Sequence, residues 1–163
     1  MVKNLIWWFR IAVFNLMLVA LIGVLLRYKI TYALPIVHQK HLLHAHSHFA
    51  FTGWVTQILM VLLVARLYTG LQNPFKKYAP VLCANLIAAY GMLFTFPFQG
   101  YGTYSIIFST LSIFAAYAFA VIYWRDLNKG KEKSAGDPWF KAALFFNVIS
   151  SAGAFALAFM MAT

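Results

Sequence analysis

The stretch KHLLHAHSHFAFTGWVT, from Lys40 to Thr56, decides the fold, because it runs from a cluster of histidines directly into sequence that is apolar enough to lie in a membrane. Ionisable side chains at the edge of a bilayer usually serve a function. The five histidines of the chain all lie in this stretch or just before it: His38, His41, His44, His46 and His48. On a helix, at about 100° per residue, His41, His44 and His48 share one face, and His46 points almost the opposite way.

The composition is that of an integral membrane protein. Of the 163 residues, 63% are hydrophobic and only 10% are charged, which exceeds the apolar share of soluble domains. Five segments have roughly the 20 residues that a membrane-spanning helix needs, and none shows the period-two alternation of a membrane β-strand. The segments are Leu5–Leu26, His41–Leu67, Ala79–Phe98, Tyr104–Trp124 and Trp139–Ala162. We therefore predict an all-α membrane helix bundle with five transmembrane helices, in a single domain that covers residues 1–163.

Turn-forming residues mark the boundaries between these segments. Asn73-Pro74 separates the second from the third, and Pro97 followed by Gln99-Gly100-Tyr101-Gly102 separates the third from the fourth. Asp137-Pro138 reads as the N-cap and first-turn proline of the fifth helix.

The net charge of +10 would suit a nucleic-acid-binding protein, but the basic residues lie between apolar segments and no nucleic-acid-binding motif is present. Membrane topology explains their distribution. Three basic residues, Arg27, Lys29 and Lys40, lie on the side away from the N-terminus. The other ten lie on the N-terminal side: Lys3, Arg10, Arg66, Lys76, Lys77, Arg125, Lys129, Lys131, Lys133 and Lys141. The positive-inside rule then predicts a cytoplasmic N-terminus, an external C-terminus and histidines in the outer third of the membrane.

The histidine pattern is suited to binding a metal ion or heme. Two histidines at i, i+4, such as His44 and His48, can chelate copper or zinc, and the wider set of candidate metal ligands is His41, His44, His46 and His48. Heme iron takes its axial ligands from opposite faces, so one helix supplies only one of them. Without histidines elsewhere, methionine is the remaining soft ligand, and Met92 and Met160 lie at a compatible depth. The alternative is structural: such histidines can also contact headgroups or hydrogen-bond to neighbouring helices.

The segment HLLHAHSHFAFTGW resembles the second helix of catalytic subunits in the heme-copper oxidase superfamily, particularly its nitric oxide reductase branch. The resemblance implies that His44 or His48 is an axial ligand of a low-spin heme, in the inner (plasma) membrane of a bacterium. Members of that superfamily have about twelve helices and carry further histidine ligands on later ones, which this chain lacks. A complete oxygen- or nitric-oxide-reducing centre therefore cannot be assembled from this chain alone. It is either the N-terminal portion of a longer protein or a short relative that binds one heme or metal, with ligand sharing across a homodimer as one way to complete the site.

The expected function is that of a membrane heme- or copper-binding protein in respiratory electron transfer, working in the lipid bilayer as a homodimer or with other respiratory subunits. Whether it is itself an enzyme stays open. The main alternative is a non-catalytic subunit or assembly factor that holds copper or heme. A small transporter fits less well, because the three acidic residues lie in or beside the loop between the fourth and fifth segments: Asp126, Glu132 and Asp137.

Overall fold

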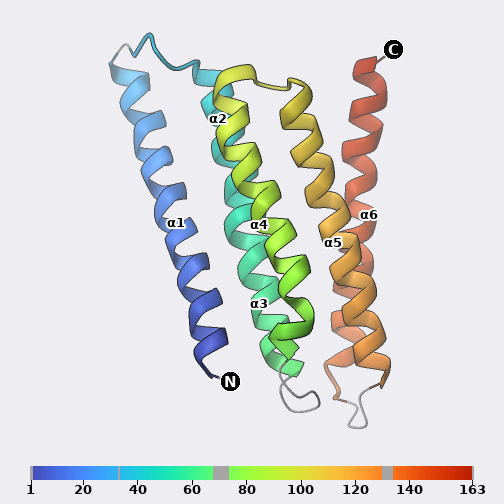
Figure 1. Cartoon of the computed structure of the whole chain (residues 1–163). Coiled ribbons are helices and arrows are strands. Elements are labelled where there is room, and N and C mark those ends of the chain that lie inside the picture. Colours follow the sequence, from blue (N-terminus) through green and yellow to red (C-terminus); the bar gives the residue numbers. More distant parts are fainter. Residues whose placement is uncertain (1, 33, 68–73, 130–133, 163) are drawn as a thin grey trace.

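The computed structural model describes residues 2–32, 34–67, 74–129 and 134–162 of the chain, and all regular structure in them is helical (Figure 1). The elements are α1 (Val2–Thr31), α2 (Gln39–Phe49), η1 (Ala50–Thr56), α3 (Gln57–Arg66), α4 (Pro74–Gln99), α5 (Thr103–Lys129) and α6 (Asp137–Ala162). The predicted all-helical class is confirmed. α2, η1 and α3 follow one another without a break, so each predicted apolar segment corresponds to one long helical rod.

Four of these rods are long and apolar enough to cross a membrane, judged over the described residues by length and composition alone. They are α1, the continuous rod of α2, η1 and α3, α4, and α5. The fifth rod, α6, has 26 residues. Large apolar side chains such as Phe94, Phe114 and Phe159 are exposed on the outside of the bundle, as expected for surfaces that face lipid.

The rods run up and down beside one another, with α4 near the centre (Figure 1). α4 packs on α2 and α3 on one side and on α5 on the other, while α1 packs on η1 and α2, and α6 packs on α5. The N-terminus lies at one end of the bundle together with the end of α3 and the start of α4. The start of α2, the turn from α4 to α5 and the C-terminus lie at the opposite end.

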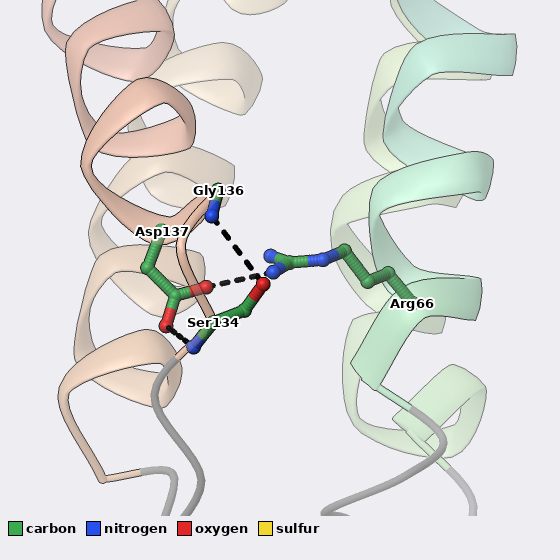
Figure 2. A network of polar contacts seen from close by, with 4 residues as sticks. All are labelled: Arg66, Ser134, Gly136 and Asp137. Atoms are coloured by element: carbon green, nitrogen blue, oxygen red, sulfur yellow. Dashed lines mark hydrogen bonds and ion pairs between the residues drawn. The ribbon is translucent and has the colours of Figure 1, made fainter.

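Two ion pairs join helices at the end of the bundle that holds the N-terminus. Lys77 Nζ donates to the Asp126 carboxylate at 2.5 and 2.6 Å, and Tyr78 Oη donates to the same group at 2.8 Å. Arg66 at the end of α3 donates to Asp137 at 2.7 Å, and Asp137 also accepts from the backbone N–H of Ser134 (Figure 2). These pairs connect α4 to α5 and α3 to α6.

The helix boundaries differ from the predicted ones in two instructive ways. α4 begins at Pro74, where a proline costs no hydrogen bond, and it continues through Pro80 and Pro97 to Gln99. Asp137 is the first residue of α6, and its carboxylate bonds to Arg66 and Ser134. The predicted third segment, Ala79–Phe98, therefore began five residues late and ended one residue early, and Asp137 is the first residue of α6 instead of the predicted N-cap before it.

Candidate functional site

α2 carries the histidines without a break in the helix. It begins at Gln39, after His38 in an extended conformation (φ −76°, ψ 120°), and stays α-helical to Phe49. Leu42, Ala45 and Phe49 form its buried face. The histidines from His41 to His48 flank that face and are half-buried, whereas His38 is exposed.

His44 and His48 contact the same two aromatic side chains, which confirms that they share a face. The His48 ring stacks on Phe96 with centroids 4.5 Å apart, and its Nε2 lies 3.2 Å from the hydroxyl of Tyr101. The His44 ring meets Tyr101 edge-on at 4.7 Å and lies 6.1 Å from Phe96. Phe96 comes from the last turn of α4, and Tyr101 from the turn between α4 and α5.

The two imidazoles differ in one respect that matters for chemistry. Nε2 of His48 has Tyr101 as a partner, but Nε2 of His44 is buried and has no hydrogen-bond partner among the described residues. A buried polar atom without a partner costs about 1–3 kcal/mol, so each such atom calls for an explanation. A ligand that His44 Nε2 could bind would satisfy it.

His41 lies further toward the start of α2 and packs over the turn between α4 and α5. A Cβ added to Gly100, which has a positive φ of 58°, would lie only 2.7 Å from the His41 ring. His41 also lies beside His38, with ring centroids 4.8 Å apart. His41 therefore shares the side of α2 that faces the turn, as the periodicity predicts.

His46 lies on the other side of α2, as predicted, and the structure places it against α1. An added Cβ on Gly23 would lie 3.3 Å from the His46 ring, so the glycine makes room for the imidazole. Nδ1 of His46 is buried and has no partner within the described part of the chain. The structure therefore separates His46 from His44 and His48.

The two methionines proposed as ligands lie in different places. Met92 on α4 is fully buried in a cluster with Ala45 and Phe96, next to the histidine-bearing turns of α2. Met160 on α6 is 71% exposed, and α5 lies between α6 and α4 (Figure 1). The structure thus brings Met92 to the site and leaves Met160 outside it.

A seven-residue π-helix, η1, follows directly after the histidines and was not predicted from the sequence. π-Helical turns are rare and frequently accompany functional sites. The carbonyl oxygens of Thr52 and Gly53, both in η1, accept hydrogen bonds from Asn85 Nδ2 at 3.0 Å and Asn15 Nδ2 at 2.5 Å. Both asparagines are fully buried. Buried amides in apolar helices are a signal that could have pointed to such a feature.

Further polar atoms extend these contacts. Asn85 also donates to Gln57 Oε1 at 2.9 Å, and Tyr90 Oη donates to Asn15 Oδ1 at 2.6 Å. Gly53 leaves room for the Phe49 ring, since an added Cβ would lie 2.7 Å from it. The π-helix is thus contacted by side chains from α1, α2 and α4 around its buried residue, Gly53.

Acidic residues do not accompany the histidines. Asp126 and Asp137, the acidic residues that the structure describes, lie at the other end of the bundle, near the end of α5 and at the start of α6. Over the residues described, no group of three or more His, Cys, Asp or Glu side chains could hold a metal ion. The site therefore offers imidazole nitrogens in aromatic surroundings. One or two of these nitrogens could bind the metal of a cofactor whose remaining coordination positions are filled by other ligands.

No family model, no curated protein and no solved structure matches the chain.

Proposed function

We propose that this protein binds heme or copper in a membrane and serves respiratory electron transfer. The observation that supports it best is His44 Nε2, a buried imidazole nitrogen without a partner among the described residues, beside His48 on the same helix face. Bound iron or copper would satisfy this nitrogen and supply a centre that exchanges single electrons.

For heme, His44 is the better axial ligand of the two candidates. His48 Nε2 is bonded to Tyr101, and the His48 ring stacks on Phe96, so its use would break existing contacts. Met92 is the candidate on the opposing helix, because its side chain packs against Ala45, next to His44 in the sequence. Met160 is exposed on α6 and would serve a heme only in an assembly with a second copy or another subunit.

For copper, His44 and His48 would act together, with the i, i+4 spacing that permits chelation. This requires His48 to give up its bond to Tyr101. His41, on the same side of α2, is a third candidate ligand, whereas His46 faces α1 and would need another site. A non-catalytic subunit or assembly factor that holds copper would use the same residues.

The proposed orientation has five membrane-spanning helices, a cytoplasmic N-terminus and the histidines near the outer face of a bacterial inner membrane. The ends of α3 and α5 and the starts of α1, α4 and α6 share one end of the bundle (Figure 1). These ends carry most of the basic residues, including Arg66, Lys77 and Lys129, as the positive-inside rule requires. Lys131 and Lys133 lie outside the described residues.

The test is an absorption spectrum and metal analysis of the purified protein and of two variants, His44→Ala and His48→Ala. If heme is bound, we expect His44→Ala to abolish its low-spin spectrum and His48→Ala only to shift it, because a neighbouring histidine tunes the iron. If copper is bound by chelation, both variants should weaken binding comparably.

His46→Ala is the matched control, because it removes an imidazole from the same helix on the face toward α1. It should retain the full cofactor content. Wild-type protein that contains neither heme nor metal after expression with both supplied would refute the proposed function, as would two variants with undiminished content.

A further inference from the structure

Two buried asparagines hold the only π-helical element that the described residues contain, and this element connects the histidines to the rest of their helix. Asn15 on α1 donates to Gly53 O at 2.5 Å, and Asn85 on α4 donates to Thr52 O at 3.0 Å. Both side chains are fully buried. A carbonyl oxygen has two lone pairs and no water competes for it in hydrocarbon surroundings, so a side-chain donor on a neighbouring helix stabilises the backbone where it binds.

The π-helix determines which way the histidines face. A π turn closes its hydrogen bond from i to i+5, so it contains one more residue than an α turn. If one such turn reverted to α-helix, the part of the rod before it would rotate by about 100° relative to the part after it. Gln57, Met60, Val61 and Val64 of α3 are buried, which fixes the part after η1. The rotation would then move His44 and His48 away from Phe96 and Tyr101.

We propose that Asn15 and Asn85 are positioning residues that hold η1 in its π-helical form and thereby direct His44 and His48 toward the α4–α5 turn. They act through the backbone of η1 and touch neither histidine in any contact described above. The inference concerns the rotational setting of α2 and holds whether or not His44 binds a cofactor, so it can fail independently of the proposed function.

The test measures how close position 48 is to position 101. In a Cys83→Ser background, which removes the single cysteine of the chain, His48→Cys and Tyr101→Cys are introduced together. Purified protein is then treated with dibromobimane, a short reagent that becomes fluorescent when both of its ends have reacted with thiols. The paired cysteines should give strong fluorescence, and each single-cysteine protein should give only background.

Adding Asn15→Leu or Asn85→Leu should reduce the fluorescence to the single-cysteine background, because leucine has a similar size but donates no hydrogen bond. Two matched controls alter the same network without removing a donor to η1. Tyr90→Phe removes only the bond to Asn15 Oδ1, and Gln57→Leu leaves Asn85 bonded to Thr52 O. Both controls should retain the fluorescence of the parent.

A deletion separates a change of helical setting from general damage. Phe51 lies in η1 and is 69% exposed, so removing it shortens the π turn by one residue without emptying the core. The deletion should restore cross-linking in the Asn85→Leu protein. With one residue fewer, an α turn connects α2 and α3 in the same rotational setting that the π turn gives in the parent. If the leucine variants fold and cross-link like the parent, or if the deletion fails to restore cross-linking, the proposal is overturned. If the Asn85→Leu protein does not accumulate, the cross-linking of Asn15→Leu with and without the Phe51 deletion gives the same comparison.

Discussion

The hydroxyl of Tyr101 is the group that distinguishes His48 from His44. Replacing Tyr101 by Phe keeps the ring that lies 4.7 Å from His44 and removes the bond to His48 Nε2. If copper is chelated by both histidines, its affinity should rise by about 2- to 10-fold, since a hydrogen bond of about 0.5–1.5 kcal/mol no longer has to be broken. Competition titration with a copper chelator measures this. A lower affinity in Tyr101→Phe would show that the tyrosine supports copper binding directly.

Gly100 allows the α4–α5 turn to lie close to the histidines. Its φ of 58° is unfavourable for residues with a side chain, and an added Cβ would lie 2.7 Å from His41 Nε2. We expect Gly100→Ala to lower the free energy of unfolding by about 1–2 kcal/mol, because an L-residue in the left-handed region pays roughly that amount. Gly153→Ala is the control, since an added Cβ there meets nothing within 4 Å. Thermal unfolding in detergent should separate the two; equal melting temperatures would contradict the prediction.

At the scale of single residues, the sequence predicts which helix face a side chain occupies better than it predicts which residues that side chain contacts. The 3.6-residue period is a local property, so it correctly placed His44 and His48 on one face and His46 on another. Phe96 and Tyr101 come from another helix and a turn about fifty residues away, and their approach depends on tertiary packing that no local pattern encodes. The orphaned nitrogen of His44 is likewise visible only once the neighbouring side chains are in place.

Among the elements, α6 is attached to the bundle by α5 and by the pair of Arg66 and Asp137 (Figure 2). Arg66, together with the backbone N–H of Ser134, lowers the pKa of Asp137 below its usual value of 3.8. A lowered pKa means that the folded state binds this proton less readily than the unfolded state. The stabilisation is therefore fully present above the usual value and is lost as the pH falls through the lowered one.

The expected outcome is that Asp137→Asn is less stable than the wild type at neutral pH and equally stable in acid. Thermal unfolding in detergent at a series of pH values measures the difference between the two proteins, which should shrink below about pH 4. High salt should also reduce it, because the pair is partly exposed. A difference that is constant from neutral pH to acid would show that the charge of Asp137 has no part in holding α6.

The helices themselves follow from hydropathy, but η1 does not. Each of the five apolar segments corresponds to one helical rod, with Leu67 lying one residue beyond the end of α3, and four of these rods are long and apolar enough to cross a membrane, judged over the described residues. A π turn leaves the apolar composition unchanged, and the 100° per residue of an α-helix, which predicts the helix faces, does not hold within it. What distinguishes η1 is the pair of amides that reach it from α1 and α4, residues far away in the sequence.

For the whole molecule, the two ends of the bundle differ in chemistry. One end carries the ion pairs of Asp126 and Asp137 and most of the basic residues, and the other carries the histidines and the α4–α5 turn. A bundle with this charge asymmetry favours one orientation in the membrane, because loops rich in basic residues resist translocation across it. We therefore expect the α4–α5 turn outside the cell membrane and the start of α6 in the cytoplasm.

Cysteine labelling in intact cells measures that orientation. In a Cys83→Ser background, single cysteines replace Tyr104, an exposed residue beside the α4–α5 turn, and Ala135, an exposed residue just before α6. In cells whose outer envelope lets the reagent reach the inner membrane, a membrane-impermeant maleimide should label Tyr104→Cys. It should label Ala135→Cys only after the inner membrane is permeabilised. The charge distribution predicts this labelling pattern, and the depth proposed for the histidines depends on it. The reverse pattern would place His44 and His48 near the cytoplasmic face, and a cofactor bound there would exchange electrons with cytoplasmic partners instead of external ones.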